Sequence, residues 1–220
     1  VDAPGMDRAC AAQSDLRVVC TGALALAAAD AGSYLPWVRA QRLAGRMVVV
    51  DANLRPSVMP DLAAYRRNVL EALQLADIIK VSDEDLGNLE LPGDGALAQA
   101  RQLLAGSQAQ LLVLTLGGAG ACLFVRDGRA WRAREAQPLA VVDTVGAGDS
   151  FLAGLLAAML RAGHAGPGGL QALDDAGCRH LLVHALASAS LCVMQRGCVP
   201  PSWEQVCERV RQAPAAMASL

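Results

Sequence analysis

Four short, almost wholly apolar runs constrain the fold of this chain more than any other feature of its sequence. Segments with apolar residues at helical spacing separate these runs, which occupy residues 17–22, 46–50, 76–81 and 111–116. A strand with two apolar faces must be covered on both sides, which is typical of a parallel sheet between helices. Such strands, alternating with helices, predict an α/β domain.

The pattern changes after residue 120. Residues 121–125 and 129–134 flank the turn pair Asp127-Gly128, which predicts an antiparallel hairpin. Beyond Val142 we expect only helices, over residues 149–162, 169–194 and 203–212. Residues 1–16 show no regular pattern, so we expect an irregular N-terminal segment followed by one domain over residues 17–220.

Composition narrows the possible functions. With 54% apolar residues, a chain of 220 residues can bury one substantial core. Its formal charge of −2 and its lack of a basic stripe argue against nucleic-acid binding. Seven scattered cysteines without a CxxC pair argue against a disulfide framework or a zinc site, and indicate a reducing cytoplasm. The longest uninterrupted apolar stretch, 23–29, is far too short to cross a membrane.

Polar residues follow the apolar runs at the points where the predicted strands end. Ligands of open parallel sheets bind beyond the carboxyl ends of the strands, so we expect these residues to lie along one edge. They are Thr21, Gly22, Asp51, Asn53, Arg55, Lys80, Ser82, Asp85, Thr115, Gly117 and residues 143–149. Lys80 is the only lysine in the chain, beside 18 arginines.

The segment Asp143-Thr-Val-Gly-Ala-Gly-Asp149 has the composition of a phosphate-binding turn. Its glycines permit backbone geometry that is closed to other residues, and the N–H groups that open the following helix would attract an anion. Asp149 could accept the proton of an attacking hydroxyl beside that anion. The alternative is an ordinary strand-to-helix turn in which Asp149 only caps the helix.

Four segments resemble one known family. Residues 143–154 (DTVGAGDSFLAG) are similar to the C-terminal signature of the ribokinase-like (PfkB) carbohydrate kinases, and residues 50–56 (VDANLRP) resemble the D-x-N-x-R segment of the fructokinase-like branch. Residues 76–86 and 114–120 add weaker matches, so that the resemblance covers about residues 17–212. It implies a ribokinase-like three-layer α/β/α fold with a mainly parallel sheet and a C-terminal antiparallel hairpin. The family's N-terminal units and small β lid are expected to be missing from this chain.

The resemblance also implies roles for individual residues. Asp149 matches the catalytic base, and the matching anion hole consists of Gly146, Ala147 and Gly148. The residues matched to nucleotide binding are Thr115, Gly117, Lys80, Asp143 and Thr144; the last two adjoin a potassium site in some members. Those matched to the substrate or the transferred phosphate are Asn53 and Arg55.

The resemblance is least direct at the metal site. Asp51, Ser82 and Asp85 fall where the family arranges polar groups around magnesium. Ser82 and Asp85 replace an asparagine and a glutamate, so we expect water-mediated rather than direct binding. Met59 stands where fructokinases often have tryptophan, which leaves the sugar undetermined.

Simpler interpretations exist for three of the polar residues. Arg55 could equally be a ligand contact or an ion-pair partner at the surface, and Lys80 could simply be solvated at the end of a strand. We expect His184, in an apolar helix, to be a satisfied core residue rather than a ligand.

The predicted function is ATP-dependent phosphorylation of a primary hydroxyl of fructose or a related ketose or keto-sugar acid. ATP, Mg²⁺ and, as in some members, K⁺ are the implied cofactors, and a homodimer is a possible assembly. The alternative is a catalytically silent nucleotide-binding or regulatory fragment of such a kinase. A dinucleotide dehydrogenase is disfavoured because neither GAGACL at 118–123 nor GAGDSF at 146–151 supplies the third glycine of G-x-G-x-x-G, and no P-loop motif occurs.

Overall fold

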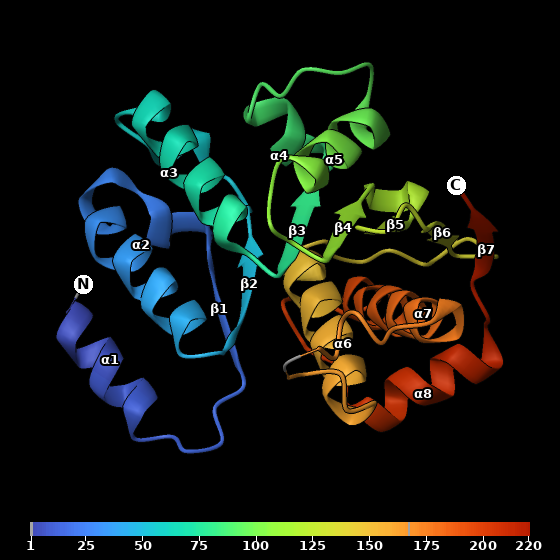
Figure 1. Ribbon diagram of the computed structural model, residues 1–220. Helices are drawn as coiled ribbons and strands as arrows, with labels where there is room; N and C mark the ends of the chain where they lie inside the picture. Colours follow the sequence, from blue (N-terminus) through green and yellow to red (C-terminus); the bar gives the residue numbers. More distant parts are fainter. Residues whose placement is uncertain (1, 167) are drawn as a thin grey trace. The chain divides into compact units, whose positions relative to one another are not determined.

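The computed structural model describes residues 2–166 and 168–220 (Figure 1). Contacts within the chain divide it into two compact units. The first contains the described residues up to Leu114 together with Phe124–Arg126 and residues 165–166, and the second contains Thr115–Leu123, Asp127–His164 and Gly168–Leu220. The predicted domain boundary at residue 16 stays a prediction.

The strands of the first unit are the predicted apolar runs. They are β1 (Val18–Gly22), β2 (Met47–Asp51), β3 (Ile78–Ser82) and β4 (Leu111–Thr115), and they follow one another in the sheet in this order. β1, β2 and β3 pair in parallel, with Gly22 opposite Asp51 and Asp51 opposite Lys80. Every residue of β2 is buried, as a strand covered on both faces requires.

Helices connect these strands. They are α1 (Ala3–Ala11), η1 (Ala23–Leu26), α2 (Ala28–Leu43), η2 (Pro56–Val58), α3 (Leu62–Leu75), α4 (Asp83–Asn88) and α5 (Ala96–Ala105). Three of them, α3, α4 and α5, lie in the segments between the predicted apolar runs, where helical spacing predicts helices.

The prediction of an irregular segment over residues 1–16 is wrong, because α1 occupies much of it. Two side chains from the region of α2 hold this helix. Gln41 Nε2 donates to Asp7 Oδ1 (3.3 Å), and Arg46 Nη2 donates to the Cys10 carbonyl (3.1 Å). Because both contacts come from residues far along the chain, the sequence of α1 alone does not predict the helix.

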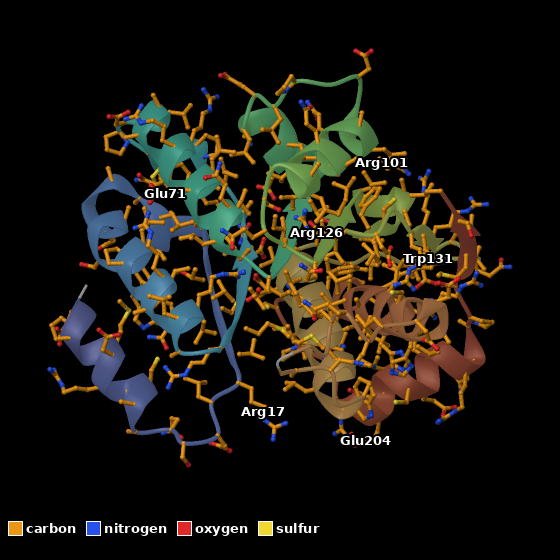
Figure 2. The ribbon with its side chains drawn as sticks, viewed as in Figure 1. Arg17, Glu71, Arg101, Arg126, Trp131 and Glu204 are labelled. Carbon is orange, nitrogen blue, oxygen red and sulfur yellow. The ribbon has the colours of Figure 1, made fainter. Side chains whose placement is uncertain are left out.

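An arginine fastens the end of α5. Arg126 (Figure 2) donates to three backbone carbonyls in and after that helix, those of Ala109 (2.7 Å), Leu104 (2.8 Å) and Ser107 (2.8 Å). Because a guanidinium carries five donors in a rigid fork, it suits such a set of acceptors. Arg126 therefore has a structural role within the first unit.

The second unit contains the predicted hairpin and the C-terminal helices. Its elements are η3 (Gly117–Ala119), the first three residues of β5 (Ala121–Val125), β6 (Ala130–Arg134), α6 (Ala147–Arg161), α7 (Asp175–Val193), α8 (Trp203–Gln212) and β7 (Ala216–Ser219). The hairpin is confirmed, and α8 has the predicted bounds. α7 begins six residues later than predicted, because Asp174 Oδ1 caps it by accepting from the Gly177 N–H (2.7 Å).

The prediction that only helices follow Val142 is also wrong. β7 pairs antiparallel with β6, with Trp131 opposite Ser219 and Arg134 opposite Ala216. Its sequence, AMAS, has little intrinsic preference for a strand, and its residues are mostly exposed. The pairing with β6 therefore determines this strand.

α6 and α7 pack closely against each other (Figure 1). Gly154 of α6 makes this possible, since a Cβ there would lie 2.6 Å from Ser188 Cβ and 2.9 Å from the His184 carbonyl oxygen. By length and composition alone, α7 would be able to cross a membrane, the only helix among residues 2–166 and 168–220 of which this is true. Of its apolar window, 56% is buried inside the structure, as is common for the core helix of a soluble protein.

Candidate functional site

The turn before α6 has the geometry that its glycines predict. Gly146 is the N-cap residue of α6 and has a φ of 78°, in the left-handed region that favours glycine. A Cβ at this position would overlap Cys198 Sγ, so the turn also needs the small residue for space. Cys192 Sγ lies 3.6 Å from the Val145 carbonyl oxygen on the same turn.

Asp143 holds the turn in place through its carboxylate. Oδ1 accepts from the Val145 N–H (3.0 Å) and Oδ2 from the Gly197 N–H (2.9 Å). These N–H groups stabilise the ionised form and lower the pKa of Asp143 below its usual range. Gly197, which follows α7 in the chain, thus helps to hold the turn before α6.

The first turn of α6 presents unsatisfied donors and a carboxylate. Ala147 donates its N–H to the Thr144 carbonyl (3.2 Å) and Ser150 to that of Gly146 (2.8 Å). Among the described residues, the N–H groups of Gly148 and Asp149 have no acceptor, as is usual at a helix N-terminus. Such groups attract anions.

Asp149 is exposed in this first turn. Gly146 is the N-cap residue, and no side chain makes a capping hydrogen bond there. The interpretation of Asp149 as a helix cap is therefore wrong. An exposed carboxylate beside unsatisfied N–H groups can accept a proton from a group that approaches the same anion.

Two further residues predicted to bind nucleotide lie at the end of β4. Thr115 is partly exposed, and Gly117 is exposed in η3. The Leu116 N–H donates to the Gly120 carbonyl (2.8 Å) and closes this loop. With Asp143 and Thr144, they belong to the second unit.

A buried ion pair joins β2 and β3 in the first unit. Lys80 Nζ lies 2.9 Å from Asp51 Oδ1, and Lys80 is only 4% exposed. The interpretation of Lys80 as a solvated residue at a strand end is therefore wrong. Its predicted contact with a nucleotide stays a prediction.

Asp85 and Ser82 form a capping box at the start of α4. Ser82 Oγ accepts from the Asp85 N–H (3.0 Å), and Asp85 Oδ2 accepts from the Ser82 N–H (2.8 Å). Asp85 Oδ1 accepts from the Leu54 N–H (2.8 Å), and Asp85 is only 3% exposed.

These contacts bear on the predicted magnesium site. Asp85 does not fit the role of a magnesium ligand, since both of its oxygens accept backbone N–H groups in a buried position. In the part of the chain that the structure describes, no group of three or more His, Cys, Asp or Glu side chains could hold a metal ion.

Asn53 and Arg55 follow β2 and point away from the buried residues around them. Asn53 is partly exposed with a φ of 36°, and Arg55 is exposed. Arg55 Nη1 donates to the Leu54 carbonyl (3.1 Å). Arg55 forms no ion pair with any residue that the structure describes, so the interpretation as an ion-pair partner finds no support.

His184 is a satisfied core residue, as predicted. It is 6% exposed, and its Nδ1 lies 2.8 Å from the His180 carbonyl oxygen. Its ring stacks on Trp203 with 5.0 Å between the centroids. Burial lowers its pKa, which favours the neutral ring.

Two residues that shape the candidate site could not be identified from the sequence. Cys198 packs on Gly146, and Leu54 supplies the N–H that Asp85 accepts. A backbone donor leaves no trace in the identity of its residue, and Cys198 lies in no motif. The four residues 51, 80, 82 and 85 are brought together in the first unit, whereas 143–149 form the turn of the second.

Known proteins that are similar to this chain in sequence include carbohydrate kinases. The sequence profile of the pfkB family carbohydrate kinases matches residues 7–205. A fructokinase from Rhizobium leguminosarum bv. trifolii is 35% identical over 138 residues, which cover 63% of this chain and 41% of the relative. A fructokinase from Vibrio alginolyticus is 32% identical over 156 residues, which cover 68% of this chain and 47% of the relative. The chain thus spans about half the length of the curated relatives it matches.

Solved structures share the fold. Aminoimidazole riboside kinase from Salmonella enterica superimposes with a TM-score of 0.74 at 25% identity, covering 89% of this chain and 62% of that one. Fructokinase from Vibrio cholerae O395, in its fructose, ADP and calcium ion bound form, gives 0.70 at 25% identity, covering 84% and 58%. The predicted three-layer α/β fold, with a mostly parallel mixed sheet and an antiparallel C-terminal part, is confirmed.

Proposed function

This chain belongs to the pfkB family of carbohydrate kinases, and on that premise we propose that it transfers the γ-phosphoryl group of ATP to a primary hydroxyl of a sugar. One observation carries the proposal: the exposed carboxylate of Asp149 lies in the first turn of α6, beside N–H groups that have no acceptor among the described residues. Phosphoryl transfer needs this combination of a base and an electrostatic cradle for the transferred group.

The proposed step uses groups of the chain itself. Asp149 takes the proton from the sugar hydroxyl as its oxygen attacks the γ-phosphorus, and the bond from that phosphorus to the bridging oxygen of ADP breaks. The N–H groups that open α6, with the positive end of its dipole, stabilise the charge on the equatorial phosphoryl oxygens. Ala147 uses its N–H inside the turn, so Gly148 and Asp149 supply the donors in this proposal.

The proposed nucleotide contacts are those predicted from the sequence. Thr115, Gly117, Asp143 and Thr144, all in the second unit, carry them. Lys80 is left out of this proposal, because its amine is buried in the ion pair with Asp51. Asp143 would act mainly by holding the turn, because both of its oxygens accept backbone N–H groups. The fructokinase relative solved with ADP supports the choice of an adenine nucleotide.

The substrate is proposed to be fructose or a related ketose or keto-sugar acid, since the relatives include fructokinases. Asn53 and Arg55 are the side chains proposed to face it. Binding of Mg²⁺ and of K⁺ stays a prediction, and no step is assigned to either ion. For Mg²⁺, the predicted ligand Asp85 does not fit. A homodimer and a cytoplasmic location also stay predictions.

A second candidate is nucleotide binding without phosphoryl transfer. It is favoured by the internal bonds of Asp85 and Lys80, two side chains that were predicted to serve the metal and the nucleotide. A sugar that is not held in line with the nucleotide would not be phosphorylated even if the base is in place.

The test compares the 220-residue chain with its Asp149→Asn variant. Release of ADP in the presence of ATP and fructose should fall about 10²- to 10⁴-fold in the variant, while ATP affinity measured by calorimetry stays unchanged. Glu204→Gln is the matched control, because Glu204 (Figure 2) is a carboxylate in the first turn of α8. Equal turnover in Asp149→Asn and the parent chain would refute the assignment of the base. ATP binding without fructose-dependent ADP release in the parent chain would favour the second candidate.

A further inference from the structure

The loop that leaves β2 is fastened to β3 and α4 at successive residues. We call residues 51–55 the β2 exit loop. Asp51 forms the ion pair with Lys80 Nζ (2.9 Å), the Ala52 N–H donates to the Lys80 carbonyl (3.0 Å), and the Leu54 N–H donates to Asp85 Oδ1 (2.8 Å). Asp51, Ala52 and Leu54 are correspondingly buried.

The two remaining side chains of the exit loop face outward. Asn53 is partly exposed and Arg55 is exposed. Tyr65 is buried, and its hydroxyl donates to the Ala23 carbonyl (3.1 Å). The backbone of the loop is thus held from within, while the side chains at 53 and 55 stay available to a ligand.

The side chain of Asp85 ties this loop to the start of α4. Its Oδ1 accepts from Leu54 and its Oδ2 from Ser82, each at 2.8 Å. A buried carboxylate that accepts two N–H groups makes strong, charge-assisted bonds, and its removal leaves both donors unsatisfied. The unusual left-handed backbone of Asn53, with a φ of 36°, lies directly before one of these donors and needs such support.

We propose that Asp85 is a positioning residue that holds the β2 exit loop so that the side chain of Arg55 is presented to a ligand, and that it is not a metal ligand. The identity of the group that Arg55 meets rests on the proposed function. The fastening of the loop by Asp85 does not.

The length of the side chain matters for this role. The carboxylate of Asp85 reaches the Leu54 and Ser82 N–H groups at once from the third position of α4. A glutamate would carry the same charge one methylene further into a buried space. Asp85→Glu should therefore fail to keep both bonds, although a glutamate is an equally good magnesium ligand.

The first experiment measures amide hydrogen exchange and Mn²⁺ binding on the 220-residue chain, with Mn²⁺ as the probe for Mg²⁺. In the Asp85→Asn variant, one amide group cannot accept from both donors, so the Leu54 N–H should exchange about 10- to 100-fold faster than in the parent chain. Mn²⁺ affinity, with and without ADP, should not change. Asp85→Glu is the second variant, in case Asp85→Asn does not fold.

Two controls separate the loop contact from general effects. Glu84→Gln removes an exposed carboxylate from the same turn and should change neither readout. Ser82→Ala removes the acceptor for the Asp85 N–H but keeps both carboxylate bonds, so the Leu54 N–H should stay protected. The proposal is overturned if the Leu54 N–H is unprotected in the parent chain, if its exchange is unchanged in both Asp85 variants, or if Asp85→Asn weakens Mn²⁺ binding.

A second experiment tests whether Asp85 acts through Arg55. If the parent chain releases ADP with fructose, Asp85→Asn should lower kcat, and the double variant with Arg55→Met should be no slower than Arg55→Met alone. Losses that multiply would overturn the link to Arg55. A parent chain without turnover would contradict the proposed function instead, and the exchange experiment would still decide the role of Asp85.

Discussion

The contact between α6 and α7 makes a sharp prediction for Gly154→Ala. The added Cβ would lie 2.6 Å from Ser188 Cβ and 2.9 Å from the His184 carbonyl oxygen, whereas carbon atoms in contact prefer about 3.5–4.0 Å. The two helices would have to separate by about 1 Å, and such overpacking typically costs about 1–3 kcal/mol. The gain in helix propensity offsets about 1 kcal/mol of this. We therefore expect the free energy of unfolding to fall by up to about 2 kcal/mol.

Gly32→Ala is the matched control for this substitution. Gly32 also lies inside a helix, α2, but a Cβ there would meet nothing within 4 Å. The same change should therefore raise the free energy of unfolding by about 0.5–1 kcal/mol. Urea unfolding, followed by far-ultraviolet circular dichroism, measures both variants against the parent chain.

The opposite signs of the two effects are the decisive result. If Gly154→Ala gains as much stability as Gly32→Ala, then α6 and α7 do not approach as closely as described. A loss in both variants would instead show that helix propensity has been misjudged at Gly32.

Three further predictions concern buried polar groups. Lys80→Met should destabilise the chain by about 3–5 kcal/mol in urea unfolding, because Asp51 would be buried without its cation, and Asp51→Asn in addition should recover part of the loss. Arg126→Met should cost about 2–4 kcal/mol in the same assay, since three carbonyls lose their donor, and a cost within error of zero would contradict the structural role. Burial lowers the pKa of His184 and of His180, so the unfolded chain binds more protons than the folded chain at mildly acidic pH. The free energy of unfolding should therefore be highest above the ordinary histidine pKa of about 6.5. It should fall as the pH drops through the lower pKa values of the folded state. His184→Phe should weaken this dependence, and an unchanged pH profile would refute it.

The sheet could be predicted from the sequence where burial alone decides the structure. β2, β3 and β4 coincide with the apolar runs to within two residues, because a strand buried on both faces has almost no other composition. β7 could not be predicted, since it depends on the exposed edge of β6 rather than on its own residues. α1 depends in the same way on Gln41 and Arg46, which lie more than 30 residues away.

In the candidate site, too, features set by neighbouring residues could be predicted, whereas those set by distant contacts could not. The turn before α6 could be predicted, because it needs the left-handed backbone that Gly146 provides and this glycine is visible in the sequence. The exposed position of Asp149 follows from that turn. The role of Asp85 depends on the Leu54 N–H, 31 residues earlier, and any residue except proline would supply that donor. The resemblance alone therefore determined the prediction for Asp85, and it predicted a place at the magnesium site instead of a contact with the loop after β2.

The burial of Lys80 has a consequence for the chemistry of the protein surface. Lys80 is the only lysine, and its amine is buried in an ion pair with Asp51 on the neighbouring strand. Acetyl donors, cross-linkers and biotinylating reagents that attack lysine amines therefore meet no accessible side chain on the folded protein. Positive charge on its surface comes from arginines, which such reagents leave untouched. Acylation of Lys80 would thus report that β2 and β3 have come apart, and the single lysine can serve as a chemical sensor of unfolding.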